Sequence, residues 1–535
     1  MSTDAAYPQD VAACHALLVQ RDATVEQHNA TIIQMQRELE QLKHFVALLQ
    51  RKRFGPRSEK LDPDQLSLFE EPAEEAAQQE ASSAEPAETV VREHRRRGGG
   101  RNALPDHLPR EIIEHDLSEE EKCCPGCGQE RTRIGSDTSE QLEFIPASLK
   151  VIQHVRHKYA CRACDGEVAR APLPPQPIDK GLPGPGLLAA LVVGKYSDHL
   201  PLYRLEDYFA RHQVELSRST LCRWAAQTAE LLAPLYDLMA QRVRLSKNIH
   251  TDDTPVSVLD PNLPHCRTGR FWCYVGDDAN PYSVYDYTAR RKRDGPAKFL
   301  AGYEGYLQAD AFAGYDGIYA GGSVKQVLCW AHARRKFHEA RTNQPEPAHR
   351  ALGFIARLYA LERKAKDLAK LEEWNLRDTD QRQRFHAARY QFRQEHALPI
   401  LDEFYTWLQE AKRDVLPKSP VGQAIRYALP RWDGLTRYCE DGALAIDNNL
   451  AERTLRLCAI GRKNWTFLGS DNGGRTAAIL FTFTASCKAN QVEPWAYLRD
   501  AIARIPAMSA DADLTLLLPD HWLADHPKAR RTWSR

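Results

Sequence analysis

The hydrophobic pattern near the start of the chain is that of a coiled-coil helix. Apolar residues recur every seven positions, and a second apolar series fills the matching d positions of the heptad. The two series are Leu18, Val25, Ile32, Leu39 and Val46, and Met35, Leu42 and Leu49. Because such a repeat gives a helix an apolar seam that another helix must cover, we predict a coiled-coil helix over residues 10–55. An intramolecular helix hairpin is the alternative.

The next segment lacks the apolar residues that a folded core needs. The helical pattern stops at a basic knot, RKRFGPRSEK, where Gly55 and Pro56 end the helix. The composition then turns to Ala, Glu, Gln and Ser, and finally to Arg and Gly. Such a segment cannot bury enough apolar surface to fold. We therefore predict that residues 56–104 are the end of the knot and a disordered linker, first acidic and then rich in Arg and Gly.

Two Cys-x-x-Cys pairs give the sharpest local signal. They are Cys124 with Cys127, and Cys161 with Cys164. Two such pairs at tight turns can place four thiolates at the corners of a tetrahedron, which is the geometry of a structural Zn²⁺ site. We predict a zinc-binding module over residues 105–172, and four buried thiols without metal are the alternative.

Beyond a Pro-rich connector, the apolar spacing is helical from Leu187 to Met239. Residues 214–229 could form the second helix of a helix-turn-helix, although a plain helical bundle explains the spacing equally well. We expect residues 173–245 to be a helical region that binds DNA or links domains.

The apolar period changes near Ile249 to the alternation that is typical of strands. The order of elements, with an Asp on the first strand and another at the end of the fourth, is that of a ribonuclease-H-like α/β sheet. In such a sheet the first and fourth strands lie side by side. The predicted strands are residues 249–259, 271–275, 282–287, 305–310 and 324–329, and the predicted helices are residues 295–303 and a helix that begins at Trp330.

Carboxylates on neighbouring strands suggest metal-dependent phosphodiester chemistry. Two carboxylates can share divalent cations, one activating the attacking oxygen and one stabilising the leaving oxygen. Asp310 ends the fourth strand, and the first strand offers Asp252 or Asp253. Because side chains alternate along a strand, only one of these two can face the metals.

A third carboxylate must complete such a site. The candidate is Glu452, which lies among basic side chains in a helix that Asp447 or Asn448 could cap. Between Asp310 and Glu452 lie 141 residues, too many for one sheet connection. Their apolar spacing is helical, so we expect a helical insertion.

The charges of the chain are segregated. Lys and Arg number 72, as do Asp and Glu, but seven Glu and no basic residue fall between positions 70 and 88, which leaves a net charge of +7 elsewhere. Basic blocks are typical of proteins with a polyanionic partner, and solvated surface charges are the alternative. The expected DNA-binding residues are Arg334, Arg335, Lys336, Arg453, Arg456, Arg462 and Lys463.

The composition excludes a membrane-spanning protein. The longest apolar run, residues 187–193, is far shorter than the roughly 18 residues of a membrane span. The first residues lack the basic start and apolar block of a secretory signal. We therefore expect a cytoplasmic protein without a membrane partner, whose 13 cysteines are metal ligands or buried thiols.

Several segments match a known family. They are HTDDTPV, YLQADAFAGYDGIY, CWAHARRKF, AIDNNLAERTLR and GRKNWTFLGSDNGG, preceded by RKRFGPRSEK and the paired cysteines. In this order they closely resemble the bacterial transposases of the insertion sequence sixty-six family over nearly the whole chain. By position, the resemblance implies a DDE triad of Asp252, Asp310 and Glu452 that binds Mg²⁺ or Mn²⁺. Asp253 stands where a Glu is more usual.

The resemblance also implies the organisation of the rest of the chain. Cys329 and His332 resemble a Cys-x-x-His element found in several DDE transposases and are possible accessory active-site residues, with a buried thiol and an incidental histidine as the alternative. The expected parts are residues 246–345 as the first part of the ribonuclease-H-like core, 346–435 as the helical insertion, 436–490 as the second part with the catalytic Glu, and 491–535 as a C-terminal helical tail.

The function implied is that of a DNA transposase. It would bind the terminal inverted repeats of its element, cut their 3′ ends and transfer them to target DNA, with Zn²⁺ in a structural role. The expected partners are double-stranded DNA, at least one further copy of the chain, and small accessory proteins of the same element, at the bacterial nucleoid. A ribonuclease-H-like nuclease and a domesticated DNA-binding regulator with a vestigial active site are the alternatives.

Overall fold

The computed structural model describes residues 175–179, 181–371, 378–509 and 511–531, with shorter stretches between residues 10 and 35 and between 149 and 170. The chain divides into two units, of which the smaller is Glu70–Val155. The predicted linker and the four cysteines of the predicted zinc module lie outside the described residues, so both remain predictions. All that follows concerns the larger unit.

The predicted N-terminal helix is present where the structure describes it. The described residues between 15 and 35 are helical. More than half of the surface of each described apolar heptad residue is exposed, namely Leu18, Val25, Ile32 and Met35. In the part of this helix that the structure describes, the heptad seam is therefore exposed.

A mixed sheet forms the centre of the larger unit, in the strand order β5-β4-β3-β6-β7. The central strand β3 pairs antiparallel with β4, and it pairs parallel with β6, as predicted for the first and fourth strands. The short strand β8 pairs parallel with the last residues of β3. The strands are β3 Asn248–Val258, β4 Arg267–Val275, β5 Ser283–Thr288, β6 Gly305–Ala309, β7 Val324–Leu328 and β8 Phe467–Leu468. A separate pair, β1 Lys158–Tyr159 and β2 Ala169–Arg170, is antiparallel.

None of the described helices is long and apolar enough to span a membrane. Along the chain, three helices precede the strands of the sheet, namely α3 Pro185–Tyr196, α4 Leu202–Arg211 and α5 Arg218–Arg244. Three more follow strands β5, β6 and β7, namely α6 Asp294–Phe299, α7 Asp316–Tyr319 and α8 Trp330–Ala340. Then follow α9 Pro345–Leu371, α10 Thr379–Asp414, α11 Pro420–Ala428, α12 Trp432–Thr436, α13 Asn449–Trp465, α14 Asp471–Ala489, α15 Pro494–Arg504 and α16 Pro519–Asp525.

Two helix predictions had wrong bounds. The helix predicted over 295–303 ends at Phe299, and the chain then turns at Gly302, whose φ of +73° favours glycine. The helix predicted over 214–229 begins at Arg218, because the hydroxyl of Ser217 accepts the N–H of Thr220 as an N-cap, and it continues to Arg244.

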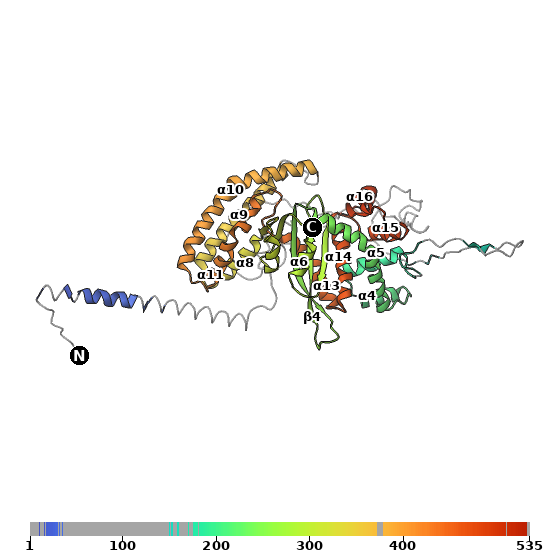
Figure 1. Cartoon of the computed structure of the whole chain (residues 1–535), viewed down its shortest axis with the longest axis horizontal. Helices are drawn as coiled ribbons and strands as arrows, with labels where there is room; N and C mark the ends of the chain where they lie inside the picture. The colour runs from blue at the N-terminus through green and yellow to red at the C-terminus, as the bar shows by residue number, and fades with distance from the viewer. Residues whose placement is uncertain are drawn as a thin grey trace, which may run out of the picture. The chain divides into compact units, whose positions relative to one another are not determined.

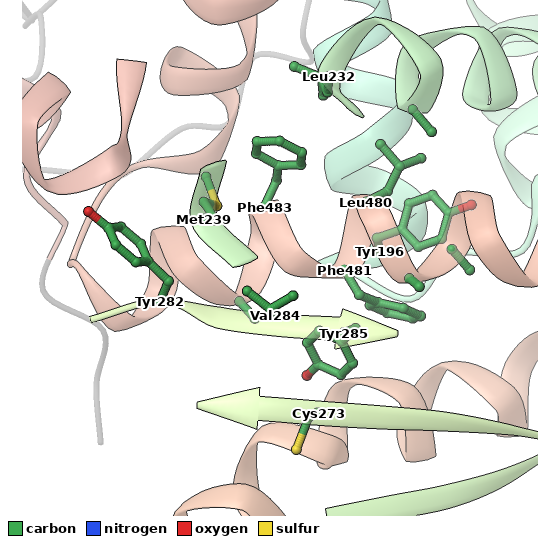
Figure 2. Close-up of a cluster of buried hydrophobic side chains, with 14 of the residues drawn as sticks. Tyr196, Leu232, Met239, Cys273, Tyr282, Val284, Tyr285, Leu480, Phe481 and Phe483 are labelled. Atoms are coloured by element: carbon green, nitrogen blue, oxygen red, sulfur yellow. The ribbon is translucent and has the colours of Figure 1, made fainter. Parts of the chain in front are cut away.

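Alternating side chains of the sheet are buried on both faces. On one face α14 lies across β5, and Figure 2 shows Phe481 directed towards Tyr285 while Phe483 points away from the strand. The ring of Phe481 also meets Tyr196 of α3 edge-on, at 5.1 Å between centroids. On the other face Tyr274 stacks on Phe299 at 3.7 Å. Burial on both faces explains why β4 shows an almost continuous apolar run.

The helices predicted between β7 and the second part of the core are present. Helices α9 and α10 lie side by side (Figure 1) and pack with α8 and α11 around a second apolar core. Its centre is aromatic, since the rings of Phe354 and Phe404 stack at 4.8 Å and Trp330 of α8 stacks on Phe404 at 5.9 Å.

A buried arginine joins these helices to the segment that precedes α13. Arg393 of α10 is 1% exposed and pairs through two nitrogens with the carboxylate of Glu362, at 2.7 and 2.8 Å. Its guanidinium also donates to the carbonyls of Tyr438, Asp441 and Leu444. All N–H groups of the Arg393 guanidinium therefore donate to acceptors inside the protein.

Removing this arginine should destabilise the protein strongly. Arg393→Ala removes both nitrogens that donate to the Glu362 carboxylate and one donor from each of three carbonyls, two of which keep another. We therefore expect a loss of about 3–5 kcal/mol of unfolding free energy, measured by urea unfolding. The matched control is Arg357→Ala, which breaks the exposed pair with Glu403 and should cost at most about 1 kcal/mol. Equal effects of the two substitutions would contradict this account.

Candidate active site

The pairing of β3 with β6 places two predicted carboxylates next to each other. His250 lies opposite Gln308 in the parallel register. Two residues further along the chain are Asp252, within β3, and Asp310, which directly follows the end of β6. The negative charge of Asp310 contributes to the raised pKa of Asp252.

Asp252 and Asp253 face opposite sides of the sheet, as the alternation predicts. Asp252 lies opposite Cys273, whose thiol donates to the carbonyl of Ala451 in α13. Asp253 lies opposite Trp272, whose ring packs against Phe312 on the other side. Because directly opposed residues share a face, Asp252 points towards α13 and Asp253 points away from it.

Asp253 forms ion pairs with two arginines. Its side chain is 2% exposed, with Arg270 at 2.9 Å on one oxygen and Arg291 at 2.7 Å on the other. The guanidinium of Arg291 lies 4.0 Å from the ring centroid of Phe312 and 3.8 Å from Asp310. The sequence analysis did not single out Arg291, which lies in a basic run without a motif of its own.

Helix α13 brings the third carboxylate. Its buried residues Ala451, Leu455 and Cys458 recur at helical spacing and face the sheet. Glu452 follows the first of them, and its side chain keeps about a third of its surface exposed. Its charge also raises the pKa of Asp252, and the two residues line the same cleft.

Asn448 fixes the start of α13 and was considered in the sequence analysis only as a helix cap. It occupies the N-cap position without a capping side-chain bond. Instead its amide donates to the carbonyl of Thr251 at 2.8 Å, and its amide oxygen lies 3.1 Å from Nδ1 of His250. Its backbone N–H donates to the sulfur of Cys329 at 3.2 Å. One fully buried asparagine thus ties α13 to β3 and to the start of α8.

The crowding of carboxylates perturbs their protonation. Burial, followed by the charges of Asp310, Glu452 and Asp253, raises the pKa of Asp252 to about 8, although the N–H of Asp253 opposes the shift. Burial also raises the pKa of Asp310, against the N–H of Phe312 and the charge of Arg291. Carboxylate oxygens suit hard divalent cations such as Mg²⁺, whose charge would offset the repulsion.

The predicted accessory pair lies beside Glu452. Cys329 precedes α8, and His332 is in its first turn. The Nε2 atom of His332 is 3.8 Å from a carboxylate oxygen of Glu452. Burial and the charges of Arg335 and Lys336 lower the pKa of His332 to about 4, so its ring is neutral at neutral pH.

A small cleft opens over Asp252 and Glu452. It has a volume of about 250 Å³ and is polar at its rim, where Arg335 and Arg456 lie with His332. Acidic groups at the base and arginines beside them are the arrangement that a phosphodiester requires, because the arginines can hold its phosphates while the acids hold cations.

The predicted DNA-binding residues differ in exposure. Arg335 and Arg462 are partly buried, and a nitrogen of Arg462 donates to Thr254 of β3 at 2.7 Å. The exposed members are Lys336, Arg453, Arg456 and Lys463. Arg334 does not fit the prediction of a surface contact, because it is 9% exposed on the face of α8 that also buries Trp330 and Phe337.

Comparison with known proteins gives the chain a family. A family model described as Transposase IS66 family matches residues 180–476, more than half of the chain. Further matches are a zinc-finger binding domain of transposase IS66 over 121–165, Transposase C of IS166 homeodomain over 41–113, and an IS66 C-terminal element over 482–519.

Three proteins of Sinorhizobium fredii are similar over nearly their whole length. The chain is 34% identical to y4hP over 89% of this chain and 88% of that protein. It is 32% identical to y4jD, over 94% and 98%, and to y4qI, over 97% and 96%. Each is named as an uncharacterized protein, so these relatives support the shared architecture without adding an activity.

The raised pKa of Asp252 predicts a stabilising substitution. From about pH 4 to pH 8 the unfolded chain has lost this proton while the folded protein retains it, so wild-type stability falls with pH. Without Mg²⁺ or Mn²⁺, Asp252→Asn should be the more stable form, by a margin that grows by at most about 1.4 kcal/mol per pH unit over this range.

Thermal unfolding between pH 5 and pH 8.5 measures this margin. The matched control is Asp253→Asn on the same strand. It removes the partner of Arg270 and Arg291 and should lower the melting temperature at neutral pH. A margin for Asp252→Asn that does not change with pH would contradict the assignment.

Proposed function

The chain is a member of the IS66 family of transposases, and on that premise we propose that Asp252, Asp310 and Glu452 are the catalytic triad of this insertion-sequence transposase. The observation that carries the proposal is that Asp252 of β3 and Glu452 of α13 line one cleft, while the parallel pairing of β3 with β6 brings Asp310 next to Asp252. These three residues are separated by up to 200 positions in the sequence, and bringing like charges together in a buried place costs stability.

We propose that the core is ribonuclease-H-like. The strand order β5-β4-β3-β6-β7, with the first three strands antiparallel and β6 and β7 parallel to β3, supports this assignment. The carboxylates of Asp252 and Asp310 then lie at adjacent positions of the two central strands, and Glu452 approaches from the helix that covers them.

The triad would hold two divalent ions, Mg²⁺ or Mn²⁺. When bound, such ions activate the attacking oxygen and stabilise the leaving oxygen of a phosphodiester. Asp252 and Asp310 supply ligands from the sheet, and Glu452 supplies one from α13. Arg335 and Arg456 hold the DNA backbone at the rim of the cleft. The chain would thus cut the 3′ ends of the element with water and then join the freed 3′ hydroxyls to target DNA, without a covalent protein intermediate.

Two further parts would bring DNA ends together. A transposase must hold two ends at once, and the uncovered heptad seam with Leu18, Val25 and Ile32 supports pairing of at least two copies. The zinc module, with Cys124, Cys127, Cys161 and Cys164 as Zn²⁺ ligands, would contribute to end binding. The same proposal includes the terminal inverted repeats, accessory proteins of the element and a place at the bacterial nucleoid.

The triad assignment predicts loss of chemistry without loss of DNA binding. Asp252→Asn, Asp310→Asn and Glu452→Gln should each reduce transposition of a marked element in cells by about 100-fold or more, or about 2.7 kcal/mol of transition-state stabilisation. Binding of end DNA, measured by fluorescence anisotropy without divalent ions, should stay within about threefold of wild type.

Asp402→Asn is the matched control, because it removes an exposed carboxylate of α10, and it should transpose normally. Full activity of any triad variant would reject that residue. A wild-type chain that cuts donor DNA but yields no joined product would instead be a nuclease.

The rim arginines predict a change in salt dependence. Arg335→Ala and Arg456→Ala should each weaken DNA binding to a similar extent on different sequences, and each should reduce the slope of log affinity against log salt by about 1. The control is Lys418→Ala, an exposed lysine near the start of α11 that lies outside the cleft. An unchanged slope in both arginine variants would remove these residues from the DNA interface.

A further inference from the structure

A thiol and an imidazole lie directly beside the carboxylate triad. The sulfur of Cys329, a ring nitrogen of His332 and a carboxylate oxygen of Glu452 lie within 4.8 Å of one another. Mg²⁺ and Mn²⁺ prefer oxygen ligands, whereas thiolate and imidazole suit Zn²⁺ and similar ions. The proposed Mg²⁺ or Mn²⁺ site therefore does not require the thiol of Cys329 or the imidazole of His332.

We propose that Cys329, His332 and Glu452 form a second, softer metal site, which takes a transition-metal ion such as Zn²⁺ or Co²⁺. Three protein ligands of these types leave the fourth tetrahedral position open. The existence of the site does not rest on the proposed function. Its consequence for catalysis does, because an ion bound here engages Glu452 and competes with the Mg²⁺ site for that carboxylate.

The distance between His332 and Glu452 is close to the distance between two ligands of one bound ion. Nitrogen and oxygen ligands of one tetrahedral Zn²⁺ lie about 3.4 Å apart, given Zn–ligand distances of about 2.0–2.2 Å. His332 and Glu452 are already 3.8 Å apart, so side-chain movements of about 1 Å suffice to close the site. His332 and Glu452 both line the open cleft, which gives an ion a path from solvent.

The surroundings of the ligands also fit an ion. The backbone N–H of Asn448 donates to the sulfur of Cys329 at 3.2 Å, the kind of support that orients metal-binding thiolates. Burial and the negative charges of Asp447 and Glu452 raise the pKa of the Cys329 thiol, and a cation bound beside these groups would offset their charge.

Cobalt spectroscopy tests this site in the full chain. The protein is first given one equivalent of Zn²⁺, which the four-cysteine module takes up preferentially because it offers four thiolates. It is then titrated with Co²⁺ in excess Mg²⁺. We expect one further equivalent of Co²⁺ to bind with a near-ultraviolet charge-transfer band between thiolate and cobalt.

The variants assign the band. Cys329→Ser should abolish it, and His332→Ala should weaken Co²⁺ binding by at least about tenfold. The matched control is Cys458→Ser, which removes a buried thiol of α13 that belongs to no cluster of metal-binding groups in the described structure and should keep the band. Circular dichroism confirms that each variant is folded, and His332→Ala decides the matter if Cys329→Ser is not.

Three results would overturn the proposal: no charge-transfer band in the folded wild type, an equal band in folded Cys329→Ser, or equal loss in Cys458→Ser. None of them bears on the transposase proposal, whose test is transposition by triad variants.

Discussion

The parallel pairing of β3 with β6 is the constraint on which the rest of the structure depends. It sets Asp252 beside Asp310 at the centre of the sheet, where burial and mutual repulsion favour the protonated form of Asp252. A fold that keeps such groups together must draw its stability from elsewhere. The two apolar cores do this, one across the faces of the sheet and one among α8 to α11. The site is thus a local cost that the surrounding packing offsets.

The second requirement is that the chain returns to the sheet after the inserted helices α9 to α11. The segment before α13 is held from three sides. Gln308 of β6 donates to the carbonyls of Ala445 and Asp447, and the backbone N–H of Trp330 donates to the carbonyl of Ile446. Asn448 then joins β3, and Arg393 and Tyr359 bind the same region from the inserted helices. The insertion is therefore part of what positions Glu452, in addition to any contact it makes with DNA.

The sequence was sufficient for the elements whose signal is local. The period-2 alternation, with one Asp on the first strand and another at the end of the fourth, predicted the central strands and their neighbours, because a buried face fixes the register of a strand. Residues that act over long separations had no such signal. Asn448 reaches His250 and Cys329 across 198 and 119 positions, and only the fold brings them together. The basic run at 334–336 led to the prediction that Arg334 lies at the surface. Successive residues of a helix point in different directions, so one of the three must face the core.

The division of labour between Asp252 and Asp253 explains why the third carboxylate must come from α13. Asp253 is adjacent in sequence but points to the other face, where Arg270 and Arg291 take up both of its oxygens. Its charge is thereby neutralised locally, and Arg291 also lies near Asp310 and against Phe312. With the neighbouring acid committed to arginines, the open side of Asp252 can be completed only by a group on the helix that covers it. In the proposed triad Glu452 is that group, since it lines the same cleft as Asp252.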